Sequence, residues 1–222
     1  MEARAVVEFS ASDLDDFLEL LTKNLAATDP GMELPGSGEL REAIERRVGA
    51  IAVENEAPAA DEVSRKNLLF TSLVLACYRE LCERMDDGGK AVDLLRESLV
   101  ELFRPTIRAY IQQRFDVDPA QPDQAFERVA ANFIARGQSG FGAGFTYEQE
   151  VQSDDASFIN VTHCFFRNFF RANGAPELTS VLCAMDTVWA EEFNNGPYNL
   201  SFERPTLMSC GDDKCRFQFT RV

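Results

Sequence analysis

Thiols and charged side chains that could do chemistry gather toward the end of this 222-residue chain. From residue 160 onward the sequence holds four of its six cysteines, together with its only histidine and its only tryptophan. Cys183 and Asp186 are three residues apart, so a helix would place the thiol and the carboxylate on one face. Cys164 and Arg167 have the same spacing one element earlier. A thiol near a cation can act as a nucleophile and a carboxylate as a base, so we expect any catalysis in this stretch.

His163 and a run of glycines are weaker signals. A single histidine excludes any triad or zinc site that needs two. On a helix, His163 would point about 100° away from Cys164, so we interpret it as a surface or supporting residue, with a general-base role as the alternative. The run from Gly140 to Gly144 suggests a phosphate cradle, but it precedes a strand and lacks a following lysine. We interpret the run as a flexible loop near a ligand.

The order of the motifs resembles one known family. Four pieces carry the resemblance, and they are Cys164, Cys183-x-x-Asp186, Arg204-Pro-Thr206-Leu207 and Gly211-x-x-x-Cys215-x-Phe217. This succession is similar to the carboxy-terminal half of the L-2-amino-thiazoline-4-carboxylic acid hydrolase family. The first 159 residues carry no motif that we can place. The resemblance implies a hydrolase that opens a small, amino-acid-derived nitrogen/sulfur heterocycle, or a member diverged to another ring-opening or ring-forming reaction in specialised metabolism.

The resemblance implies a catalytic set of Cys183, Asp186 and Cys164. The substrate would be a cyclic isothiourea with an electrophilic carbon between nitrogen and sulfur and a carboxylate on the ring. Asp186 would bind the amidine-like cation or act as a general base toward water. Cys183 or Cys164 would attack the ring carbon. The alternative for these cysteines is simple burial between helix and sheet.

The resemblance also implies a substrate-binding set. Arg204 or Arg167 would hold the substrate carboxylate, because a guanidinium matches a carboxylate with two parallel hydrogen bonds. Thr206 and Cys215 complete this set. We expect the catalytic and binding residues to converge on one pocket, without a cofactor.

The sequence also fits a different class of protein, a small-molecule-sensing domain. The ending from Cys210 to Phe217 also resembles that of vinyl-reductase-like small-molecule-sensing domains, in which thiolates hold a zinc ion. Cys164, Cys183, Cys210 and Cys215 would be enough ligands for a tetrahedral site, although the sequence has no Cys-x-x-Cys pair. A further alternative is an inactive partner of an active homologue.

The composition of the chain limits the classes of partner that it could bind. The chain has 37 acidic and 22 basic residues, a formal net charge of −15. Such a chain repels phosphate backbones and anionic lipids, so we expect a small-molecule substrate, no nucleic acid and no membrane, and leave a homo- or hetero-oligomer open. The sequence has no apolar run of the ~20 residues that span a bilayer. Its first ten residues do not resemble a signal peptide, so we expect a cytoplasmic protein.

Hydrophobic periodicity predicts an α+β fold. The predicted helices cover residues 14–21, 40–48, 61–85, 91–115 (bent at Pro105), 125–135 (ending at Gly137), 161–172 and 177–193. The predicted strands cover residues 145–151, 198–203 and 215–222, the last two joined by a turn at Gly211. We expect a helical amino-terminal part (1–137) packed on a small antiparallel sheet with its own helices (138–222), together forming one compact unit.

Overall fold

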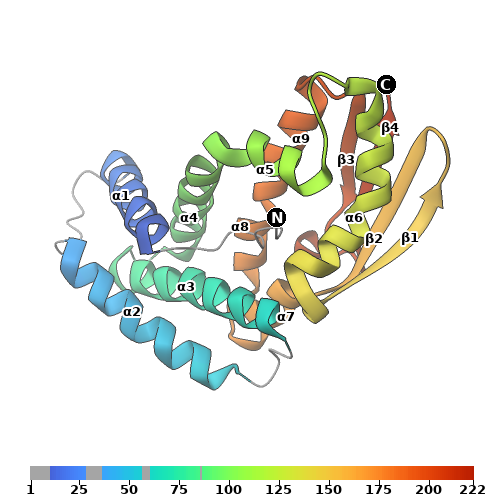
Figure 1. Ribbon diagram of the computed structural model, residues 1–222. Helices are drawn as coiled ribbons and strands as arrows, with labels where there is room; N and C mark the ends of the chain where they lie inside the picture. The colour runs from blue at the N-terminus through green and yellow to red at the C-terminus, as the bar shows by residue number, and fades with distance from the viewer. Residues whose placement is uncertain (1–10, 29–36, 57–60, 86) are drawn as a thin grey trace.

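A computed structural model describes residues 11–28, 37–56, 61–85 and 87–222. The first ten residues, on which the signal-peptide prediction depends, lie outside these ranges. The predicted α+β fold is confirmed: helices occupy one side of the molecule and an antiparallel sheet the other (Figure 1). Within the described ranges, no helix has the length and apolar character needed to cross a membrane.

Among the described residues, six α-helices precede the sheet. They are α1 (Ala11–Thr28), α2 (Ser37–Glu54), α3 (Glu62–Met85), α4 (Gly88–Phe103), α5 (Ile107–Phe115) and α6 (Ala125–Phe141). The elements that follow are β1 (Phe145–Gln152), β2 (Ala156–Cys164), α7 (Phe165–Ala172), α8 (Thr179–Cys183), α9 (Met185–Asn195), β3 (Leu200–Thr206) and β4 (Cys215–Arg221).

The predicted bend at Pro105 is confirmed. The α4 helix begins at a cap in which the side chain of Asp87 accepts a hydrogen bond from the backbone N–H of Lys90. It ends at Phe103, and a single 3-10 turn containing Pro105 leads into α5. Proline lacks a backbone N–H and cannot continue the helical ladder, so one periodic stretch becomes two helices.

The sheet has the strand order β1-β2-β4-β3, with every neighbouring pair antiparallel. On one face Ile159 lies opposite Phe217, and α6 and α9 cover this face (Figure 1). The other face is polar: Arg216 forms an ion pair with Glu150, which also accepts a hydrogen bond of 2.7 Å from Asn160. The alternation along each strand therefore separates core from surface.

The structure corrects the predicted helix over residues 161–172. Residues 161–164 belong to β2, and α7 begins only at Phe165. The β2 strand pairs with β1 on one side and with β4 on the other, so its conformation is set by strands from elsewhere in the chain. The predicted helix over residues 177–193 is also divided, into α8 and α9 on either side of Ala184.

The α6 helix does not end at Gly137. It continues to Phe141, and Gly137 lies where the ring of Tyr147 packs against the helix. A Cβ atom at residue 137 would lie 2.7 Å from Cζ of Tyr147, so the glycine allows β1 and α6 to approach closely. The division into residues 1–137 and 138–222 stays a prediction.

Two hydrophobic clusters form the core of the described part of the chain. The first cluster joins α1–α4 to α7 and α8, with Leu75, Leu95 and Phe170 fully buried. The second cluster joins α5, α6 and α9 to the sheet, with Phe115 and Phe219 fully buried. Each cluster therefore combines helices that are far apart in the sequence.

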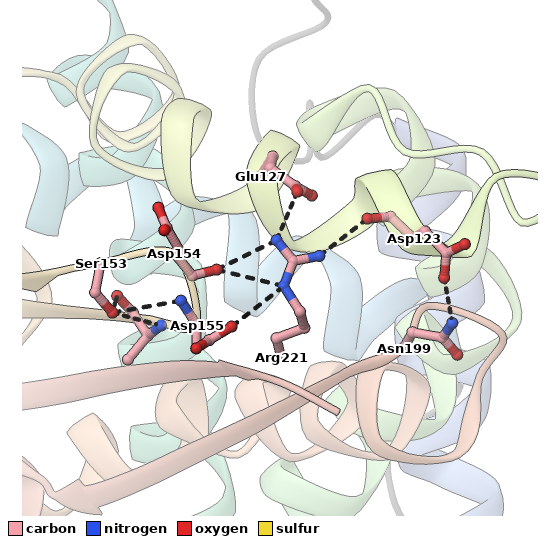
Figure 2. A network of polar contacts seen from close by, with 8 residues as sticks. Asp123, Glu127, Ser153, Asp154, Asp155, Asn199 and Arg221 are labelled. Carbon is pink, nitrogen blue, oxygen red and sulfur yellow. Dashed lines mark hydrogen bonds and ion pairs between the residues drawn. The ribbon is translucent and has the colours of Figure 1, made fainter.

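Arg221, the last residue of β4, joins the sheet to the start of α6 (Figure 2). Its guanidinium donates hydrogen bonds to the carboxylate of Glu127 at 2.5 Å and to the backbone oxygens of Asp154 and Asp123 at 3.2 Å. The guanidinium carbon also lies 4.9 Å from the centre of the Phe126 ring. This pairing lowers the pKa of Glu127. Arg221 thus joins the β1–β2 turn, the start of α6 and the end of β4.

Candidate functional site

A cavity of about 170 Å³ lies where the two clusters meet. Leu182 of the first cluster, Phe133 of the second and Phe145, which packs against both, line it. Most of its wall is apolar. The aromatic lining residues are Phe70, Phe103, Tyr110, Phe133, Phe141, Phe145, Tyr147, Phe166, Trp189 and Phe217. An apolar cavity with few polar groups is typical of a small-molecule site.

The structure brings five of the seven predicted site residues to this cavity. They are Cys164, Cys183, Asp186, Arg204 and Cys215. Thr206 lies outside the lining at the end of β3, opposite Arg216, and its hydroxyl is buried without a hydrogen-bond partner among the described residues. Arg167 also lies outside the lining, on α7, where its backbone N–H hydrogen-bonds the sulfur of Cys164.

Arg204 and Asp186 form an ion pair at the cavity wall. Nη1 of Arg204 donates to Oδ2 of Asp186 and to the backbone oxygen of Cys183, the latter at 3.3 Å. The guanidinium carbon lies 5.2 Å from the centre of the Phe217 ring. The Arg204 side chain is only 10% exposed. Three of the family motifs, those that contain Asp186, Arg204 and Phe217, therefore contact one another although they are separate in the sequence.

This pairing changes the roles that the sequence suggests for the two residues. The family resemblance implies that Arg204 or Arg167 holds a substrate carboxylate, yet the guanidinium of Arg204 already pairs with Asp186. Among the described residues, only Oδ2 of Asp186 accepts a hydrogen bond, so Oδ1 remains available to a ligand. Nε of Arg204 is buried and has no hydrogen-bond partner in the described part of the chain.

Three of the lining residues are thiols, which we call the cavity thiols: Cys164, Cys183 and Cys215. Burial raises the pKa of each, and raises that of Cys164 to about 12. The positive charge of Arg204 opposes this effect by lowering the pKa of Cys183 and of Cys215. The sulfur of Cys215 accepts a hydrogen bond of 3.2 Å from the backbone N–H of Met208. Because burial dominates, the cavity thiols are protonated near neutral pH.

Arg114 and Tyr110 are lining residues that the sequence analysis missed. Both come from α5, before the family motifs begin. The guanidinium carbon of Arg114 lies 5.7 Å from the centre of the Tyr110 ring and 5.4 Å from that of Phe141. The only sequence signal was their four-residue spacing, which puts ring and cation on one helix face.

The glycine run forms neither a phosphate cradle nor a flexible loop. It ends α6 and forms a turn whose backbone hydrogen-bonds to the carboxylate of Asp61. Gly140 and Phe141 end α6, and the next three residues form a 3-10 turn. The carboxylate of Asp61 accepts the backbone N–H of Ala143 at 2.7 Å and that of Ser64 at 2.6 Å. These hydrogen bonds lower the pKa of Asp61. A carboxylate held at this turn would repel a phosphate.

The remaining candidate residues lie away from the cavity. His163 is exposed, as expected for a surface residue, and its Nε2 lies 3.2 Å from Nδ2 of Asn168. Cys210 is exposed. Across residues 11–28, 37–56, 61–85 and 87–222, no group of three or more His, Cys, Asp or Glu residues is placed to hold a metal ion. The zinc alternative thus has no ligand set in the described part of the chain.

Fold and site together define an α+β protein with an aromatic cavity that holds thiols and an ion pair. The chain belongs to the L-2-amino-thiazoline-4-carboxylic acid hydrolase family, whose sequence model matches residues 66–219. The match begins within α3, so the resemblance extends well beyond the carboxy-terminal half in which the sequence analysis placed it.

Comparison with other proteins adds little. No curated protein matches the chain. Among solved structures, the H-NOX domain of Shewanella oneidensis is 12% identical over 82% of this chain and 97% of that one, with a TM-score of 0.34. The H-NOX protein of K. algicida is 10% identical over 93% of this chain and 95% of that one, with a TM-score of 0.35. Scores this low carry no inference about fold or function.

Proposed function

We propose that the protein is a hydrolase that opens a small, thiazoline-like heterocycle derived from an amino acid. Membership of the family supports the reaction class. The observation that carries the proposal is that Cys183 and the Asp186–Arg204 ion pair line one cavity, with the backbone oxygen of Cys183 accepting a hydrogen bond from Arg204. A nucleophile, a carboxylate and a cation in one enclosed space are the groups that attack on an amidine carbon requires.

The proposed reaction begins with the thiol of Cys183. Its sulfur forms a bond to the ring carbon that lies between nitrogen and sulfur, and the thiol proton moves to the ring nitrogen. One ring bond to that carbon then breaks, and the departing atom keeps the electron pair and takes up a proton from a nitrogen on the same carbon, which restores a C=N bond. Water next adds to the same carbon, and the sulfur of Cys183 leaves and regains its proton. The sum of these steps is addition of one water molecule to the substrate.

Asp186 and Arg204 would serve these steps in different ways. Oδ1 of Asp186 can accept an N–H of the amidine and relay the proton between Cys183 and the ring nitrogen. Arg204 holds the carboxylate in place, because it donates to Oδ2. Apolar walls strengthen these interactions by excluding water. The high pKa of Cys183 means that proton transfer has to accompany attack.

Turnover of L-2-amino-thiazoline-4-carboxylate, followed by mass spectrometry of substrate and product, tests the proposal. We expect Cys183→Ser and Asp186→Asn each to lower the rate by at least about 100-fold. Cys210→Ser is the matched control, because Cys210 is an exposed thiol outside the cavity, and it should keep the parent rate. Asp186→Asn also leaves Arg204 without its anionic partner and so lowers stability. The rates should therefore be measured at a temperature at which melting curves show each variant to be folded.

Two outcomes would contradict the proposal. If both cavity variants match the parent rate, Cys183 and Asp186 are structural residues. If the parent chain is stabilised by the compound but does not convert it, the protein is a binding module or an inactive partner.

A further inference from the structure

Arg114 is a cavity cation without a carboxylate partner in the described residues. One of its nitrogens, Nη2, donates to the backbone oxygen of Arg136 at 2.6 Å. Its Nε atom is buried and has no hydrogen-bond partner within the ranges that the structure covers. The rings of Tyr110 and Phe141 lie beside the guanidinium. A guanidinium held in this way keeps unused donors at the cavity wall.

Tyr110 supplies a second unused polar group at the same place. Its hydroxyl oxygen is buried, and no described residue hydrogen-bonds to it. Tyr110 precedes Arg114 by one turn of α5, and both line the cavity. Burial raises the pKa of Tyr110 to about 12, so the hydroxyl is a neutral donor. Buried polar groups are nearly always paired, so two unpaired donors side by side indicate a ligand that accepts hydrogen bonds.

The other cations that line the cavity have acidic partners. Arg204 is paired with Asp186, and Nζ of Lys66 lies 3.5 Å from Oε1 of Glu62. Within the described part of the chain, Arg114 is therefore the lining cation whose charge is not matched by an ion pair. A ligand that places negative charge beside Arg114 would supply the missing partner.

We infer that Arg114 and Tyr110 form an anion subsite that holds the carboxylate of the ligand. A guanidinium binds a carboxylate with two parallel N–H bonds, and the Tyr110 hydroxyl can donate a third. If the proposed function holds, this carboxylate belongs to the substrate, and Arg114 takes the anchoring role that the family resemblance implies for Arg204 or Arg167.

The position of Trp189 indicates what kind of ligand would fit between the anion subsite and the Asp186–Arg204 pair. The ring of Trp189 lies 5.7 Å from that of Tyr110, and Trp189 follows Asp186 by three residues on α9. The anion subsite and the Asp186–Arg204 pair are therefore joined by an aromatic wall. The ligand class is a small organic acid whose carboxylate is attached to a flat or apolar body that packs on Trp189.

Fluorescence of Trp189, the only tryptophan, can measure binding directly. The probes are phenylacetate and phenylacetamide, which share one ring and differ in charge. Neither contains the amidine carbon that the proposed hydrolysis needs, so binding is tested separately from catalysis. We expect the parent chain to bind the acid at least tenfold more tightly than the amide, and Arg114→Gln to abolish this preference.

Matched variants make the result specific. Arg128→Gln removes an exposed arginine that pairs with Asp116 outside the cavity, and it should keep the preference for the acid. Arg114→Lys keeps the charge and should retain part of it. Cys183→Ser should keep all of it, even if that variant is inactive. Equal affinity of the parent chain for acid and amide, or an unchanged preference in a folded Arg114→Gln variant, would overturn the inference.

Discussion

At the scale of single residues, the cavity thiols are held neutral by the walls around them. Burial raises the pKa of Cys164, Cys183 and Cys215, and the nearby Arg204 offsets this only in part at Cys183 and Cys215. A protonated thiol is a weak nucleophile but is protected from oxidation and from unrelated electrophiles. The site is therefore suited to a thiol that ionises only as it reacts with a bound substrate.

Alkylation by iodoacetamide at pH 8 tests this state. Only thiolate reacts, and a pKa of about 12 leaves roughly one Cys164 thiol in ten thousand ionised at that pH. We expect exposed Cys210 to be labelled first and the cavity thiols to remain unlabelled for hours, as read by peptide mass spectrometry. Labelling should become faster as pH rises toward the raised pKa values.

Denaturation provides the control for this experiment. In urea all six cysteines should react, because the burial that raises the pKa values is lost. Rapid labelling of native Cys183 at pH 8 would show that it rests as a thiolate, contrary to the expected protonation state.

At the scale of elements, one carboxylate fixes how α3 meets the end of α6. Asp61, just before α3, accepts N–H groups from Ser64 and from Ala143. Asn67 of α3 donates to the backbone oxygen of Phe141 at 2.8 Å. Asn67 and Phe141 both line the cavity, so this junction positions part of its wall.

Gly142→Ala should disrupt this junction. Gly142 has a φ of +71°, which other residues rarely adopt, and a Cβ atom would lie 2.6 Å from Oδ1 of Asp61. We expect a loss of about 1–3 kcal/mol in the free energy of unfolding. Gly49→Ala is the matched control: Gly49 is exposed within α2 with open space around it, so alanine should stabilise by up to about 1 kcal/mol. Urea titrations that give equal midpoints for the two variants would refute the role of this junction.

At the scale of the whole molecule, the cavity is the place where the two hydrophobic clusters meet. Phe145 packs against both clusters, and lining residues come from both. The first cluster also depends on α7 and α8, which lie between strands of the sheet in sequence. The buried residues of the first cluster run from Phe17 to Leu182 and those of the second from Ile111 to Phe219, so the two clusters share a long stretch of the chain.

We therefore predict that the chain unfolds in a single cooperative transition. Fluorescence of Trp189 reports the second cluster, whereas far-ultraviolet circular dichroism reports the helices of both. The two signals should give coincident urea curves. A fluorescence transition that is displaced from the circular dichroism transition would show that the clusters unfold separately. A carboxylate ligand at 100 times its Kd should move both curves together, by about 2.7 kcal/mol.

Local signals in the sequence determined much of the fold. The extent of α3, the break at Pro105 and the strands β1, β3 and β4 follow from helical or alternating periodicity and from proline chemistry, all of which act within a few residues. The ordered motifs likewise identified Cys183, Asp186 and Arg204 and the family to which they belong.

Only the tertiary structure decided how these parts meet. The β2 strand forms because partners lie on both of its sides, and no local pattern encodes that pairing. Asp186 and Arg204 are 18 residues apart and became an ion pair only when β3 packed beside α9. Arg114 lies far from every motif and reaches the same cavity because α5 packs against α9. Contacts between distant segments depend on how amphipathic elements bury their faces together, and a one-dimensional pattern specifies those faces but not their partners.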